Sequence, residues 1–115
     1  MTPRELDALV AEKVMGVEVS QPDGSSSGYL HIREWGEELP RYSSDIAAAW
    51  SVVEKLRGEE GFAIDLTSVG SPTSWDWNVH IEHPTDEAGY WLGTAKEAPR
   101  AICLAALRAK GVEVP

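Results

Sequence analysis

The sequence predicts an α+β fold, in which an antiparallel sheet of about four to five strands packs against three helices in the order α-ββ-α-βββ-α. Two observations carry this prediction. Three segments show the apolar spacing of helices, and the segments between them alternate apolar and polar residues. Because each strand is apolar on one side only, a parallel sheet buried on both faces is disfavoured. The 115 residues fit a single domain, residues 1–115.

The composition predicts a globular intracellular protein. Hydrophobic residues make up 43% of the chain and charged residues 25%, which is typical of a folded domain. Cys103 is the only cysteine, so no internal disulfide can form and a reducing, cytoplasmic setting is expected. No segment is apolar over the length that a bilayer span needs, and no signal peptide is recognisable, so no membrane association is expected.

The net charge of −9 argues against binding to nucleic acid, because such binding depends on neutralising backbone phosphates. It leaves open a cationic protein partner or mimicry of the charge of DNA. The plainer interpretation is that acidity keeps a small protein soluble.

The first helix is predicted from about Pro3 to Met15. Thr2 can cap it, Pro3 suits the first helical position, and Glu5 can complete a capping box. Gly16 is the expected end.

A hairpin is predicted next, with strands at residues 17–20 and 29–33 around the polar turn-rich segment 21–28. The segment 34–42 is predicted to be irregular, with Trp35 and Tyr42 anchoring it to the core. An exposed Trp35 would instead indicate a binding surface.

The second helix follows, with Ser43 or Ser44 as its cap, Asp45 in its first turn and Gly58 as its end. Its spacing predicts one apolar face, formed by Ile46, Ala49, Trp50, Val53 and Leu56.

Three strands are predicted after it, at residues 62–69, 75–82 and 90–93. In the middle strand, alternation places one set of residues under the helices: Trp75, Trp77, Val79 and Ile81. The third helix has Pro99 in its first turn and Gly111 at its end. Its predicted inner face is formed by Ile102, Cys103, Ala106 and Leu107.

Two histidines and a glutamate near the end of the middle strand raise the question of a metal site. His80 and Glu82 share a strand face, but His83 points away, and zinc needs three or four ligands. His31 could join them only if its hairpin lay alongside. No metal and no cofactor are therefore predicted.

The polar face of the predicted sheet is the candidate binding surface. It carries a ladder of hydrogen-bonding side chains: Asp65, Asp76, Asn78, His80 and Glu82. Such a face could bind a polar ligand or a partner, although antiparallel sheets often leave one side in water without any such role. A catalytic version would pair His80 with one of the carboxylates as acid and base.

Other catalytic signals are weak, so the protein is not expected to be an enzyme. Ser43 and Ser44 are explained as helix caps, and Cys103 as a small buried apolar residue. The segment "GSSSG" lacks the lysine and the strand-to-helix context of a phosphate-binding loop.

Three segments together resemble the phage ABA sandwich domain family: "ELDALVAEKVMG", "YSSDIAAAWSVVEKL" and "APRAICLAALRAKGVEV". The resemblance implies layered helices and sheet, a bacteriophage or prophage source, and hence the cytoplasm of a bacterial host. It brings no catalytic residues. The family name implies helices on both sides of the sheet, whereas the alternation predicts helices on one side, which we retain.

Three functions follow, in order of preference. The first is a non-catalytic phage accessory protein that binds a host or phage protein. The second is a protein that binds and sequesters a small molecule or nucleotide, and the third is a small hydrolase centred on His80. Pairing of the polar face or an edge strand with a second copy would give a homodimer.

Overall fold

The computed structural model describes residues 1–20, 31–32, 37–83 and 89–114. Its helices are α1 (Pro3–Lys13), α2 (Ile46–Glu59) and α3 (Ala98–Ala109). Its strands are β1 (Val19–Ser20), β2 (His31–Ile32), β3 (Glu37–Glu38), β4 (Ala63–Ser71), β5 (Ser74–Glu82) and β6 (Tyr90–Ala95). The α+β class and the three helices are confirmed. The single sheet of about four to five strands is not, because the described strands form two separate three-stranded antiparallel sheets, β1-β2-β3 and β4-β5-β6.

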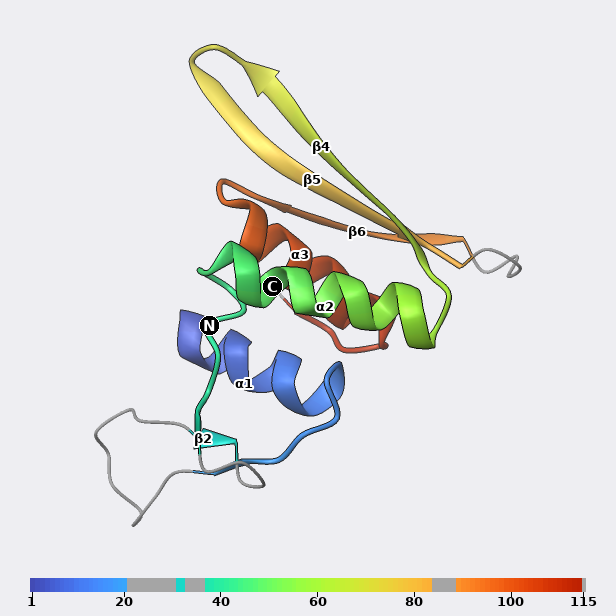
Figure 1. Cartoon of the computed structure of the whole chain (residues 1–115). Coiled ribbons are helices and arrows are strands. Elements are labelled where there is room, and N and C mark those ends of the chain that lie inside the picture. The colour runs from blue at the N-terminus through green and yellow to red at the C-terminus, as the bar shows by residue number, and fades with distance from the viewer. Residues whose placement is uncertain (21–30, 33–36, 84–88, 115) are drawn as a thin grey trace.

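The three helices lie on one side of the larger sheet, β4-β5-β6 (Figure 1). Helix α3 lies against β6 and β5, α2 packs beside α3, and α1 packs on α3 farther from this sheet. The small sheet lies beyond α1 (Figure 1). Among the described residues, no helix covers the other face of the larger sheet, as the alternation of its strands predicts.

Helix α3 is the centre of the core. Every residue from Ala101 to Leu107 is buried, because the larger sheet covers one side of the helix and α1 and α2 cover the other. The predicted inner face, which includes Ile102 and Cys103, is confirmed but is only part of the buried surface. The backbone of β6 rests directly on α3: a Cβ atom at Gly93 would lie 2.3 Å from the Ala101 carbonyl oxygen.

Helix α1 begins and ends close to the predicted positions. The Thr2 hydroxyl accepts a hydrogen bond from the Glu5 amide at 3.2 Å. The helix ends at Lys13 rather than near Met15, and Gly16 at φ 72° turns the chain away.

The ends of α2 differ from the prediction. Asp45 caps the helix, since its carboxylate accepts from the Ala47 amide at 3.0 Å, so the cap assigned to Ser43 or Ser44 is wrong. Gly58 lies within the helix. The chain leaves it at Gly61 (φ 71°), where the Phe62 amide donates to the Leu56 carbonyl.

The predicted apolar face of α2 is partly wrong. Ala49, Val53 and Leu56 are buried, but Ile46 is 52% exposed and Trp50 is 46% exposed. The buried face is rotated toward Val52, because α2 packs mainly on α3 and only its far end meets β4.

The hairpin of β4 and β5 extends beyond the helices (Figure 1). Val79 and Ile81 are buried as predicted, but Trp75 is 51% exposed and Trp77 is 37% exposed, so their predicted burial is wrong. Alternation places all four on the face toward the helices, which we call the inner face. The cover ends before the tip, because β6 ends at Ala95, opposite Trp77.

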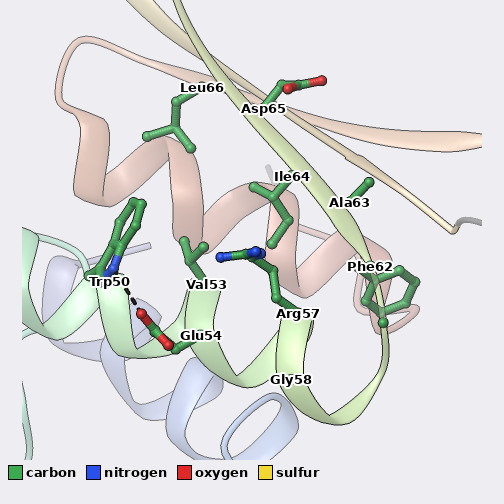
Figure 2. A pocket seen from close by; sticks show the side chains of 11 residues that line it. Trp50, Val53, Glu54, Arg57, Gly58, Phe62, Ala63, Ile64, Asp65 and Leu66 are labelled. Atoms are coloured by element: carbon green, nitrogen blue, oxygen red, sulfur yellow. Dashed lines mark hydrogen bonds between the residues drawn. The ribbon is translucent and has the colours of Figure 1, made fainter.

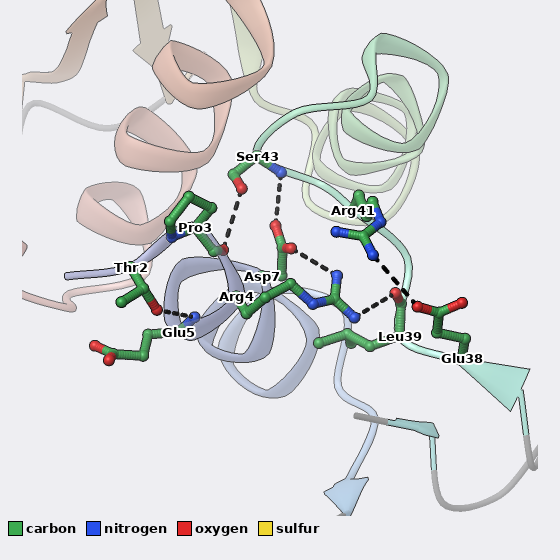
Figure 3. A network of polar contacts seen from close by, with 9 residues as sticks. All are labelled: Thr2, Pro3, Arg4, Glu5, Asp7, Glu38, Leu39, Arg41 and Ser43. Carbon is green, nitrogen blue, oxygen red and sulfur yellow. Dashed lines mark hydrogen bonds and ion pairs between the residues drawn. The ribbon is translucent and has the colours of Figure 1, made fainter. Parts of the chain in front are cut away.

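A buried carboxylate joins α1 to the segment before α2 (Figure 3). Asp7, 1% exposed, accepts hydrogen bonds from the Ser43 amide at 2.7 Å and the Arg4 guanidinium at 2.8 Å. Arg4 also donates to the Leu39 carbonyl at 3.0 Å. Tyr42, next to Ser43 in the chain, is 3% exposed, so its predicted anchoring in the core is confirmed.

The region between α1 and α2 is only partly described. Pairing of β1 with β2 agrees with the predicted hairpin, and β3 forms within the segment predicted to be irregular. The prediction for Trp35 lies outside the described residues.

Candidate binding surface

The outer face of the larger sheet, opposite the helices, carries the predicted site. Strand register places its residues in rows across β4, β5 and β6. The rows are Ala63, Glu82 and Tyr90; Asp65, His80 and Leu92; and Thr67, Asn78 and Thr94.

Four of the five predicted residues lie within these rows. Asp65 stands beside His80, and Glu82 stands in the neighbouring row. The Asn78 amide oxygen accepts a hydrogen bond from the Thr94 hydroxyl at 3.0 Å. Asp76 is set apart, because it lies in the overhanging part of β5 and forms an ion pair with Lys96 at 2.9 Å.

Two residues of this surface were missed by the sequence analysis. Tyr90 is 60% exposed and Leu92 is 39% exposed, and both lie on the outer face of β6. The segment "YWLG" gave no signal for them, because apolar residues occupy both of its faces. In the structure, Trp91 and Gly93 lie on the inner face of β6.

His80 lies at the centre of this surface, in a shallow hollow of about 440 Å³ lined also by Asp65, Thr67, Asn78, Tyr90 and Leu92. The His80 ring meets the Tyr90 ring edge to face, with centroids 4.8 Å apart. Its Nε2 atom is buried and has no hydrogen-bond partner among the described residues.

The second histidine of the stretch does not join the first. The His83 ring packs edge to face on Phe62, with centroids 5.5 Å apart, and Phe62 in turn packs on Trp91. Across residues 1–20, 31–32, 37–83 and 89–114, no three His, Cys, Asp or Glu side chains gather in a way that could hold a metal ion.

The only thiol lies in the core rather than at the surface. Cys103 is fully buried, and this burial raises the pKa of its thiol to about 12, with the nearby Asp7 carboxylate adding to the rise. The thiol therefore stays protonated and shielded at neutral pH, as expected of a small apolar core residue.

None of the described helices is both long and apolar enough to cross a membrane. Among curated proteins, none matches the sequence significantly.

Comparison with solved structures finds a phage protein from Bacillus cereus ATCC 14579, known from a crystal structure. It shares 29% sequence identity with this chain at a TM-score of 0.72, and the match covers 100% of this chain and 93% of that one. The family model of the phage ABA sandwich domain matches residues 8–107. The matched residues contain all of α2 and the whole of the larger sheet. They also contain α1 from residue 8 onward and α3 up to residue 107. The chain therefore belongs to the phage ABA sandwich domain family.

Proposed function

We propose that this chain is a phage accessory protein that acts by binding another protein, from the phage or its host, through the outer face of β4, β5 and β6. The observation that carries the proposal is the exposure of Tyr90 and Leu92 on strand β6, beside the acidic and polar side chains of the outer face. Aromatic and aliphatic anchors surrounded by polar groups are the usual composition of protein interfaces.

The charge of this surface indicates the kind of partner. Asp65 and Glu82 are exposed on the strands next to Tyr90 and Leu92, and the whole chain carries a net charge of −9. A matching partner would present a small apolar contact surrounded by lysine or arginine. Opposite charges would speed its association, and added salt would slow it.

Capture from phage-infected or lysogenic cells tests the proposal. The double variant Tyr90→Asp, Leu92→Asp replaces both exposed apolar contacts of the surface with charges and should lose the partner that the wild type retains. Lys13→Glu is the matched control, because it changes the net charge by the same amount at an exposed position, the last residue of α1. Retention of the same partner by the double variant would contradict the proposal.

A second candidate function is binding of a small polar molecule, such as a nucleotide, in the hollow around His80. The polar lining of the hollow, with Asp65, Thr67 and Asn78 around it, favours this function. Thermal-shift measurements with a panel of nucleotides should then show stabilisation that His80→Ala abolishes. Equal melting temperatures with and without every nucleotide would reject this second function and leave the protein-binding proposal intact.

A further inference from the structure

Strand β4 offers an open edge to solvent. It pairs with β5 on one side only, and no other strand of the described chain lies beside it. The strand runs for nine residues, and Asp65 is its only charged residue. Natural edge strands are normally protected by lysines, prolines, bulges or short length, so an edge of this kind is suited to pairing with another strand.

A groove runs beside this edge, between β4 and α2 (Figure 2). It encloses about 720 Å³. Trp50 and Val53 line it from α2, and Ile64 and Leu66 line it from the inner face of β4. Trp50 is held in place by a hydrogen bond from its Nε1 to the Glu54 carboxylate at 3.1 Å, yet remains 46% exposed.

An uncovered apolar surface lies at the other end of the same strand. Trp75 and Trp77 belong to the inner face of the overhanging hairpin. Their neighbours across the ladder are Gly70 and Ser68, which are too small to cover the indoles. The groove and the two indoles thus lie on the same side of the sheet but at opposite ends of β4.

We propose that the edge of β4 pairs antiparallel with β4 of a second copy of this chain. A two-fold axis perpendicular to the sheet reverses the strand but keeps the inner face on the same side. Each overhang then lies beside the groove of the other copy, so that the indoles of Trp75 and Trp77 cover Trp50 of the second copy. The same surface therefore supplies both halves of a self-complementary contact.

The side chains of β4 favour a register centred on Thr67 over one centred on Asp65. With Thr67 opposite Thr67 of the second copy, Asp65 stands opposite Val69, and Leu66 stands opposite Ser68. A register centred on Asp65 would instead place two carboxylates face to face, which is destabilising, whereas threonine pairs across strands are favourable.

The exposed tryptophans supply a substantial part of the area that a stable contact needs. The exposed parts of Trp50, Trp75 and Trp77 together provide about 300 Å² of apolar surface per copy, since a tryptophan side chain buries up to about 250 Å². A standard interface buries about 800 Å² per partner, and the nine-residue strand edge and the exposed Ile46 supply further area.

Thr67→Lys tests the proposal, because it would place two lysines face to face at the axis. Thr94→Lys is the matched control: Thr94 occupies the same row of the outer face as Thr67, on the opposite edge strand. Sedimentation velocity over micromolar concentrations should show a wild-type dimer, a Thr94→Lys dimer, and dimerisation weakened more than about tenfold in Thr67→Lys. Circular dichroism confirms that each variant is folded.

Cross-linking tests the register. Thr67→Cys should oxidise to a covalent dimer, because directly opposite Cα atoms of an antiparallel pair lie within disulfide reach. Thr94→Cys should still dimerise but form no disulfide-linked dimer. The buried Cys103 does not compete. A wild-type monomer throughout the concentration range, or a dimer that Thr94→Lys disrupts and Thr67→Lys does not, would overturn the proposal. Because the pairing uses the β4 edge and not Tyr90 or Leu92 on β6, these results are independent of partner capture.

Discussion

At the scale of single residues, the carboxylate of Asp7 is the most consequential buried polar group. It lies in α1 but accepts hydrogen bonds from the amide of Ser43, 36 positions along the chain, and from Arg4. Removing one partner of a buried charged network leaves the others without compensation in a water-free site. The three groups therefore fix how α1 meets the segment that leads into α2.

Asp7→Ala should lower the free energy of unfolding by about 3 kcal/mol, because both the Ser43 amide and Arg4 lose their acceptor. Asp7→Asn should cost roughly half as much, since an amide oxygen can still accept from Ser43. Urea denaturation measures both. The control is Glu38→Ala, which removes an exposed ion pair with Arg41 and should cost less than roughly 0.5 kcal/mol. Equal losses for Asp7→Ala and Glu38→Ala would contradict this role.

The Cys103 thiol makes the free energy of unfolding depend on pH in the alkaline range. The pKa of its thiol rises from an ordinary value of 9.0 to about 12 in the folded protein. Below pH 9 the thiol is protonated in both states and its contribution to stability is complete. Above pH 9 only the unfolded chain loses the proton, so stability falls as the pH rises toward 12.

The stability advantage of the wild type over Cys103→Ala should therefore shrink by about 2 kcal/mol between pH 8.5 and pH 10.5. Urea denaturation of both proteins at each pH measures it. Tyr42, whose pKa burial also raises, is present in both proteins, so its titration largely cancels in the difference. A constant difference across this range would show that the thiol is not shielded as described.

At the scale of elements, the close approach of β6 to α3 sets the thickness of the core. Besides the short distance to the Ala101 oxygen, a Cβ at Gly93 would lie 2.5 Å from the Ala105 amide nitrogen. Alanines at positions 101 and 105 allow the strand to approach this closely. The two elements form a unit that cannot accept one more carbon between them.

Gly93→Ala should destabilise the fold by about 3 kcal/mol or prevent folding, because backbone atoms of α3 would have to move. Gly58→Ala provides the matched comparison: the same change in helix α2, where the added carbon meets nothing within 4 Å. It should raise stability by roughly 0.5–1 kcal/mol, since alanine favours the helix. Thermal melting of the two variants checks this, and a Gly93→Ala protein as stable as the wild type would refute the close packing.

At the scale of the whole molecule, the sequence predicted the helices and the alternation of the strands, because both depend on local spacing. It could not predict how far the helices cover the sheet. Trp75 and Val79 follow the same alternation, yet only Val79 lies above α3, since cover depends on where β6 and α3 end. Contacts between residues far apart in the sequence could not be predicted either. Nothing in the sequence around Asp7 indicates that its carboxylate is buried against the amide of Ser43.

The candidate surface was predicted to a similar extent. The polar ladder around His80 followed from alternation along β5 and β4 alone. Tyr90 and Leu92 did not, because "YWLG" is apolar on both faces and only pairing with β5 decides which side chains turn outward. The part of the surface best suited to binding a protein thus depends on tertiary pairing.

The proposed function requires that the outer face of β4, β5 and β6 lies open to water. Hydroxyl-radical footprinting of the free protein measures this directly by comparing residues of one type. Tyr90, 60% exposed, should be oxidised far faster than Tyr42, 3% exposed, and Leu92, 39% exposed, far faster than Leu104, 5% exposed. Protection of Tyr90 and Leu92 equal to that of Tyr42 and Leu104 would mean that this face is covered, and would contradict the account.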